Sequence, residues 1–177
     1  MIPEAVQQQL AGAINTLRII VLSLANGLFI FGLLAFYQNQ GKAVHWGTEI
    51  NPLLLGLGLL NLVLGLVIPR LIQPSRPVQV IPLPEPAAPS DEERLLSRCV
   101  AILSQIQTRT IIACALFEGG AFANIYWYYT HQELAHLAIA GVLFSAILLH
   151  FPRKSAIFQE IETRIRQEDE DSLLGPR

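Results

Sequence analysis

Four long apolar stretches dominate the pattern of hydrophobic and polar positions along this chain. They extend over residues 17–37, 52–72, 110–129 and 134–151. A helix needs about 20 mostly apolar residues to cross a bilayer core of about 30 Å, and charged residues are almost absent from these stretches. The pattern therefore predicts an all-α membrane protein with four transmembrane helices.

Three shorter segments show helical amphipathic periodicity. Apolar residues recur at helical spacing in residues 5–17, 91–109 and 155–168. Ser90 and Glu93 have the spacing of a capping box, which predicts a helix that begins directly after Ser90 and continues into the third apolar stretch. We expect helices 1 and 3 to extend into the cytoplasm and the three segments to pack as a small bundle. The alternative is that the last segment lies on the membrane surface, which its mixed charge disfavours.

Prolines divide the chain into two tandem hairpins. Seven of the eleven prolines lie between Pro69 and Pro89, which predicts an extended segment without helix. The predicted organisation follows the order of the chain: a first transmembrane hairpin (1–72), a proline-rich cytoplasmic linker (73–90), a second hairpin with its helical extension (91–152), and an amphipathic cytoplasmic helix with an acidic, solvated tail (153–177).

The two hairpins resemble each other. Residues 19–27 align without gaps to residues 111–119, with four of nine positions identical, and the alignment matches Asn26 with Glu118. We interpret this as a tandem duplication whose pseudo-symmetry axis lies along the membrane normal. Small residues four apart recur in both helices, and we expect helices 1 and 3 to pack through them. These candidate helix-packing residues are Ser23, Gly27, Ala115 and Gly119.

The distribution of basic residues predicts the orientation. Of the twelve Lys and Arg residues, Lys42 is the only one between the first two stretches, and the connection between the last two has none. The positive-inside rule then places both termini and the linker in the cytoplasm of a multi-pass inner-membrane or plasma-membrane protein.

Composition agrees with this class. The chain has 177 residues, of which 52% are hydrophobic and 15% charged, and its net charge of −2 argues against a nucleic-acid partner. Cys99 and Cys114 fall on one predicted helix about 22 Å apart at 1.5 Å per residue, so we expect two free thiols.

Glu118 is the candidate for intramembrane chemistry. It lies near the middle of its predicted span, where an exposed ionised carboxylate costs a few kcal/mol or more. With Asn26 and Asn61 it makes up a candidate intramembrane polar site. Two interpretations remain open: a structural hydrogen bond from Glu118 to one of these asparagines that joins helices, or a proton or cation site.

Other polar residues give weaker signals. His45, His131 and His136, with Glu49 and Glu133, could surround an outer metal ion, but their spacing is not that of a zinc motif and we expect no metal site. We expect Asn124 to bind a backbone carbonyl.

The sequence therefore predicts a non-enzymatic structural, assembly or accessory subunit embedded in the lipid bilayer. We expect it to associate with itself or with another membrane protein, without a cofactor. No phosphate loop, nucleophile elbow or catalytic carboxylate pair is recognisable. The alternative is a small oligomeric transporter or proton-linked channel that uses Glu118 with Asn26.

Overall fold

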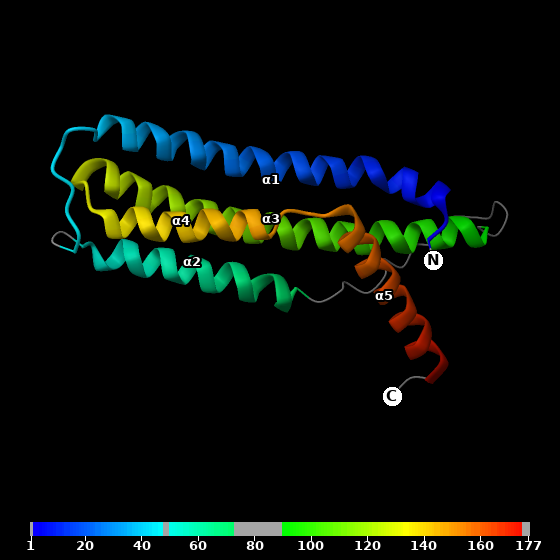
Figure 1. Ribbon diagram of the computed structural model, residues 1–177. Helices are drawn as coiled ribbons and strands as arrows, with labels where there is room; N and C mark the ends of the chain where they lie inside the picture. Colours follow the sequence, from blue (N-terminus) through cyan, green and yellow to red (C-terminus); the bar gives the residue numbers. More distant parts are fainter. Residues whose placement is uncertain (1, 48–49, 73–89, 175–177) are drawn as a thin grey trace, which may run out of the picture. The chain divides into compact units, whose positions relative to one another are not determined.

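The computed structural model describes residues 2–47, 50–72 and 90–174 of the chain, with side chains up to residue 170. In these ranges the chain forms five helices and no strand, so the all-α prediction is confirmed. The helices are α1 (Glu4–Gln38), α2 (Pro52–Leu71), α3 (Asp91–His131), α4 (Leu134–Leu149) and α5 (Lys154–Leu174) (Figure 1). The proline-rich segment of residues 73–89, predicted to be a linker, lies outside the described residues.

Three helices, α1, α2 and α3, are long and apolar enough to cross a membrane. The fourth predicted span is shorter than expected, because α4 has 16 residues and therefore a length of about 24 Å at 1.5 Å per residue. Pro152 follows shortly after its end and cannot continue a helix. Counted together with α5, from which it is separated by a bend of 64°, α4 gives a fourth candidate span. The described helices are thus those of a protein suited to a membrane.

The chain folds as two compact units. The first, here called the bundle unit, comprises residues 1–16, 73–108 and 152–177. The second, called the hairpin unit, comprises residues 17–72 and 109–151. The helices α1 and α3 contribute residues to both units.

The bundle unit contains the three amphipathic segments predicted to pack together. Their apolar stripes are buried: Val6, Leu10, Ile14, Cys99, Ile102, Leu103, Ile106, Ile157 and Ile161. Hydrogen bonds join each pair of segments. The Gln107 side chain donates to the Ala13 carbonyl, Arg164 donates to the Gln105 side chain, and the Ile2 amide donates to Glu162. The predicted packing of the three segments is confirmed.

The capping box at the start of α3 is confirmed as well. The Glu93 amide donates to Ser90 Oγ over 3.3 Å, and the Ser90 amide donates to Glu93 Oε2 over 2.8 Å. Two amides that the first turn of a helix leaves without partners are satisfied in this way.

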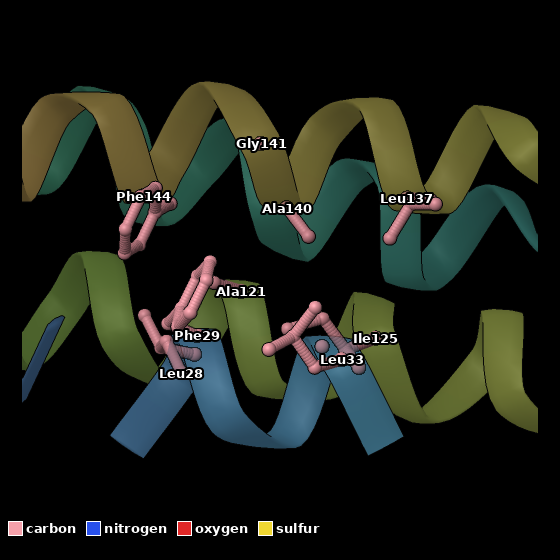
Figure 2. A pocket seen from close by; sticks show the side chains of 10 residues that line it. Leu28, Phe29, Leu33, Ala121, Ile125, Leu137, Ala140, Gly141 and Phe144 are labelled. Carbon is pink, nitrogen blue, oxygen red and sulfur yellow. The ribbon is translucent and has the colours of Figure 1, made fainter. Parts of the chain in front are cut away.

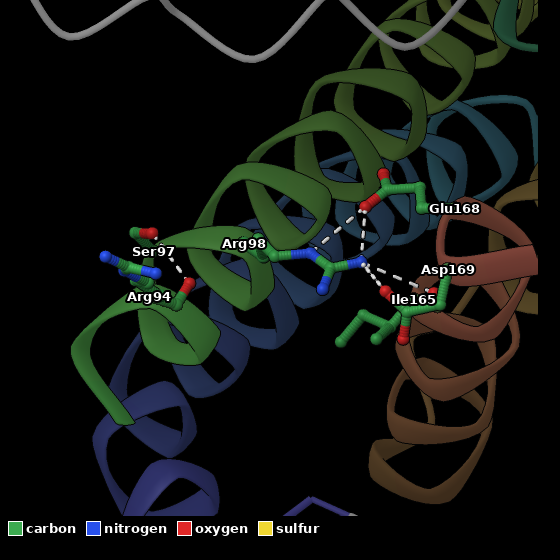
Figure 3. Close-up of polar contacts among 6 residues, drawn as sticks. All are labelled: Arg94, Ser97, Arg98, Ile165, Glu168 and Asp169. Carbon is green, nitrogen blue, oxygen red and sulfur yellow. Dashed lines mark hydrogen bonds and ion pairs between the residues drawn. The ribbon is translucent and has the colours of Figure 1, made fainter. Parts of the chain in front are cut away.

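The last helix is longer than predicted. It was expected to end near residue 168, but α5 continues to Leu174. The described acidic residues of the tail, Glu168, Asp169 and Glu170, are exposed, which agrees with the prediction of a solvated tail. The Arg98 guanidinium binds Glu168 at 3.0 Å and Asp169 at 2.9 Å, and also donates to the Ile165 carbonyl (Figure 3). Burial lowers the pKa of Arg98, but its hydrogen bonds to both acids outweigh burial and leave that pKa raised. A forked guanidinium can join two neighbouring acids, and here it ties the end of α5 to the start of α3.

In the hairpin unit, α3 and α4 lie between α1 and α2 (Figure 1). Phe31 of α1 packs on Phe122 of α3 with ring centroids 5.3 Å apart, and Phe29 packs on Phe144 of α4 at 6.4 Å. Near the middle of α1, where the hairpin unit begins, the Arg18 guanidinium lies 5.2 Å from the centroid of the Phe151 ring.

Glycines bring α2 close to the other helices. A Cβ added at Gly58 would lie 2.7 Å from Ile139 Cγ2 and 2.8 Å from Asn124 Nδ2, and one at Gly65 would overlap the Phe117 ring. On α3, a Cβ at Gly120 would lie 3.1 Å from atoms of Asn61 and Leu143. Helix packing through small residues therefore occurs in this unit, with α2 as the helix that approaches closely.

The surface of the hairpin unit is apolar. Among the described residues, the exposed large hydrophobic side chains all belong to this unit, with the single exception of Val100. Leu53 and Leu149 are examples at 82% and 85% exposure. Such a surface matches lipid and does not match water.

Candidate functional site

Buried polar side chains in the hairpin unit gather at the end where its helices are connected. Four polar or charged side chains are buried among the described residues: Asn39, Asn124, Glu133 and His136. They come from the end of α1, the last turns of α3 and the start of α4. Because a buried polar group needs hydrogen-bonding partners, the contacts of these four decide what this end of the unit can do.

Asn124 and His136 form the centre of this region. Asn124 Nδ2 donates to the Gly120 carbonyl over 2.8 Å and to the Leu54 carbonyl over 3.3 Å. Carbonyls only accept, so the other amide atom, Oδ1, must face His136 Nδ1, which is 2.8 Å away. His136 Nδ1 therefore carries the proton and donates it to Asn124. The prediction that Asn124 binds a backbone carbonyl is confirmed.

The second ring nitrogen of His136 connects α4 to α2. The Asn51 amide donates to His136 Nε2 over 3.2 Å, so this nitrogen accepts and the imidazole is neutral. Asn51 is also the N-cap of α2, with its Oδ1 accepting from the Leu53 amide at 3.0 Å and from the Leu54 amide at 3.3 Å. We call Asn51, Asn124 and His136 the loop-end cluster. Together they join α2, α3 and α4.

Backbone pairing surrounds the cluster. The His45 amide donates to the Gln132 carbonyl over 3.1 Å, and the Leu134 amide donates to the His45 carbonyl over 3.0 Å. Beside this pair, Glu133 Oε1 accepts from the Gly47 amide at 2.5 Å. Gln132 has a φ of 55°, the left-handed backbone that turns α3 into α4. The two connections of the hairpin unit are thus held to each other.

Asn39 fixes the end of α1 in the same way. Its Nδ2 donates to the Tyr128 carbonyl over 3.1 Å, and its Oδ1 accepts from Lys42 Nζ over 3.0 Å. The end of α1 is therefore attached to the last turns of α3. Trp127 stacks on His131 with ring centroids 3.7 Å apart and lies 5.8 Å from the His136 ring, which covers the cluster with aromatic surface.

Two of the three histidines considered as metal ligands have other side-chain partners. Both ring nitrogens of His136 are used within the loop-end cluster, and His131 Nδ1 lies 2.6 Å from Thr130 Oγ1. In the part of the chain that the structure describes, no group of three or more potential ligands could hold a metal ion. Glu49, the further candidate, lies outside the described residues.

The structure does not bring the predicted intramembrane site together. Glu118 is half-buried on α3 and makes no side-chain hydrogen bond or ion pair with any residue that the structure describes. Asn26 is exposed on α1. Asn61 is half-buried and lies against Gly120. The hydrogen bond expected from Glu118 to one of these asparagines is therefore not made within one chain.

The four predicted helix-packing residues also lie apart from the packed faces. Ser23, Ala115 and Gly119 are exposed and Gly27 is half-buried. A Cβ added at Gly27 or Gly119 would meet no atom within 4 Å. Within one chain α1 and α3 pack through Phe31 and Phe122 instead, because the small-residue faces point elsewhere.

An apolar pocket of about 250 Å³ lies between α1, α3 and α4 (Figure 2). Leu28 and Leu33 come from α1, Ala121 and Ile125 from α3, and Phe144 from α4. The lining is entirely apolar in residue type, and Glu118 is not part of it. This pocket therefore offers no polar group for a chemical step.

Sequence reasoning missed the loop-end cluster. The signal was present in His136, a polar residue one turn inside an apolar helix, and in Asn124, which lies 12 positions before it. Their pairing depends on how α3 turns into α4 at Gln132, which no periodicity reveals. Comparisons of the chain with protein-family models, with curated proteins and with solved structures give no match.

Proposed function

We propose that this chain is a non-enzymatic integral membrane protein that serves as a structural, assembly or accessory subunit. Its hairpin unit crosses an inner or plasma membrane, with the loop end outside and both termini in the cytoplasm. The uneven distribution of Lys and Arg supports this orientation, since Lys42 is the one basic residue in the two loop-end connections.

The loop-end cluster is the observation that carries the proposal. Asn51, Asn124 and His136 use their polar atoms on one another and on the backbone. This is the arrangement of a group that holds helices in place, since a reactive histidine needs a ring nitrogen that can reach a substrate. The apolar surface of the hairpin unit then serves contact with lipid and with other helices.

Association with a partner would use both units. The hairpin unit offers an apolar surface within the membrane, and the bundle unit offers charged helix faces in the cytoplasm. Arg94 and Glu92 at the start of α3 are exposed and available to such a partner. An accessory subunit with these two surfaces can hold a membrane partner by its spans and a soluble partner by its helical extension.

A second candidate function is a small oligomeric transporter or proton-linked channel. The observation that favours it is Glu118, a carboxyl in a candidate span that forms no side-chain hydrogen bond or ion pair with the residues that the structure describes. Intramembrane carboxyls of this kind occur in proton and cation pathways. Four helices enclose little space, so this function requires several copies of the chain around a common path.

The first test concerns the membrane. Tagged protein should remain in the membrane after alkaline carbonate extraction. In intact cells, an impermeant maleimide should label Lys42→Cys from outside and should leave Glu92→Cys unlabelled until the membrane is opened. The reverse labelling would contradict the proposed orientation, and release by carbonate would contradict the membrane assignment.

The second test separates the two functions. We expect proteoliposomes with the wild-type protein and with Glu118→Gln to show the same proton flux as protein-free vesicles. Capture in mild detergent from native membranes should recover the same protein in stoichiometric amount with both variants. A pH-dependent flux that Glu118→Gln abolishes, with folding retained, would instead establish the transporter.

A further inference from the structure

The contacts between α1 and α3 show which residues of the two helices are level. Phe31 packs on Phe122, Gly32 faces Ile125, and Asn39 binds the Tyr128 carbonyl. Residue numbers rise in the same direction along both helices, so the helices run parallel. The two residues of each contact differ by about 90 positions, and both helices have the same rise per residue. By this register Asn26 of α1 is level with Glu118 of α3.

These two level side chains form no hydrogen bond with each other. Asn26 is about 100° around α1 from the buried Ala25, so it faces away from the packed side of the helix. Glu118 is one turn before Phe122 on the same face of α3, beside the contact between α1 and α3. Neither side chain forms a hydrogen bond with the residues that the structure describes.

We propose that Glu118 of one copy of this chain hydrogen-bonds to Asn26 of a second copy, and that this bond joins copies side by side in the membrane. The proposal rests on the membrane assignment made under the proposed function. A rotation about the membrane normal moves a copy sideways without changing its depth. Asn26 of one copy therefore stays level with Glu118 of the next in any assembly of this symmetry.

The two groups are complementary. A neutral carboxyl has one O–H donor and one carbonyl acceptor, and the amide of Asn26 offers N–H donors and a carbonyl acceptor, so a pair of hydrogen bonds can close between them. Ser23 lies on the exposed side near Asn26, and Gly119 adjoins Glu118 with open space beyond its Cα. These small neighbours let a second helix approach closely, which an interhelical hydrogen bond requires.

A second copy of this chain can offer Glu118 an amide, but it cannot offer Glu118 a basic side chain. No Lys or Arg occurs in residues 19–41 or 110–149, so this chain has no cation at the depth of Glu118. What it does have at that depth is the amide of Asn26, which forms no hydrogen bond with the residues described by the structure. A foreign helix with a basic residue is the competing occupant, and the experiment below distinguishes it.

Disulfide trapping between two differently tagged chains tests the contact. Both chains carry Cys99→Ala and Cys114→Ala, one adds Asn26→Cys, and the other adds Glu118→Cys. Oxidation in native membranes should link the two tags. The matched control replaces Asn26→Cys with Ile19→Cys. Ile19 is also exposed on α1 but lies about 10 Å away along the axis, so it should give no such link.

Hydrogen bonding is tested in a second measurement that uses the full chain in detergent or lipid. Glu118→Gln keeps a donor and an acceptor and should keep the wild-type association. Glu118→Leu and Asn26→Leu should weaken the association by a factor between about 3 and about 30, as expected for one interhelical polar pair. Leucine suits an apolar surface, so these variants remain folded in the membrane.

The outcomes are distinct. A specific disulfide together with weakened association of the leucine variants supports the proposal. A monomeric wild-type chain overturns it, as does equal linking at Ile19→Cys, or linking of Glu118→Cys exclusively to a foreign protein. If the chain stays in the membrane but is monomeric, this inference fails while the proposed function stands. If carbonate releases the chain, the membrane assignment fails first.

Discussion

The bundle unit and the hairpin unit distribute polar and apolar groups in opposite ways. The bundle unit buries aliphatic stripes such as Leu10, Ile102 and Ile161 and keeps its ion pairs, such as Arg98 with Glu168, at its surface. The hairpin unit exposes its large hydrophobic side chains and buries Asn124 and His136. The first is arranged as a protein in water, where burial of apolar surface stabilises the fold. The second has the distribution that suits the proposed membrane location, where packing and polar pairs join helices.

This contrast shows where stability resides in each unit. In lipid the apolar surface gains little from burial, so the hairpin unit depends on the close approach at Gly58 and Gly65 and on the loop-end cluster. In the bundle unit the apolar core carries the stability, and its exposed ion pairs add little. Substitutions in the two units therefore have different expected effects.

The largest effect is expected for His136→Leu. It leaves Asn124 Oδ1 and the Asn51 amide without partners in a buried place, each at a cost of about 1–3 kcal/mol. In detergent, the hairpin unit of this variant should unfold at a clearly lower denaturant concentration than that of the wild type, as measured by circular dichroism. Thr163→Ala, at an exposed hydroxyl in α5, is the control and should change little. Equal stability of wild type and His136→Leu would show that the cluster does not hold the helices.

Gly65→Ala should have an intermediate effect. The added Cβ would overlap the Phe117 ring and push α2 away from α3, and overpacking of this kind costs about 1–3 kcal/mol. Gly56→Ala is the matched control on the same helix, because a Cβ there meets no atom within 4 Å. We expect it to be neutral or stabilising by up to about 1 kcal/mol through helix propensity. A loss of stability in both variants alike would contradict close packing at Gly65.

Arg98→Ala tests the bundle unit and should have a small effect. The Arg98 side chain is 37% exposed, so its pairs with Glu168 and Asp169 are screened by solvent and contribute about 0–1 kcal/mol. The difference in stability between Arg98→Ala and the wild type should be smaller in high salt. Thermal unfolding of the bundle unit measures it. Limited proteolysis should show cleavage in the last turns of α5 earlier than in wild type. A loss of stability as large as that expected for His136→Leu would show that ion pairs, and not the apolar core, stabilise this unit.

The smallest effect is expected for the titration of Cys99. Burial raises the pKa of this thiol, with a partial opposing effect of the Arg98 charge. The pKa of the thiol is higher in the folded state than in the unfolded state, so the protonated thiol favours the folded state at a pH below its ordinary pKa. This contribution to the free energy of unfolding is lost as the pH rises through the pKa of the folded state. The stability difference between wild type and Cys99→Ala should therefore narrow between pH 7 and pH 10 in denaturant titrations. A difference that is constant over this range would contradict the burial of the thiol.

Helix boundaries were largely predictable. The capping box at Ser90 and the long apolar runs act locally, through hydrogen bonds one turn apart and through composition, so the start of α3 and the extent of α2 follow from the sequence. The end of α4 was overestimated, because its hydropathy continues past the point where the helix stops before Pro152. The continuation of α5 to Leu174 was missed, because it accompanies an ion pair with Arg98, about 70 positions away in the chain.

The candidate site was less predictable than the fold. Sequence alone identified Glu118 and Asn26 as polar residues in apolar helices, and their equal depth follows once α1 and α3 are parallel. It did not indicate that neither side chain forms a hydrogen bond with the described part of the chain. It considered His136 as a metal ligand and did not indicate that its imidazole joins three helices through Asn51 and Asn124.

The sequence by itself determined that this chain is helical, that its long helices suit a membrane, and where amphipathic segments extend them, because periodicity, capping and hydropathy are properties of neighbouring residues. Only the tertiary structure decided which glycines allow close approach, which polar groups satisfy one another and which remain without a partner. Those outcomes depend on the rotation and depth of each helix against the others. The buried Phe117 and the half-buried Glu118 are neighbours in the chain and about 100° apart around α3. No local pattern specifies the rotation of the helix that buries one of them and not the other.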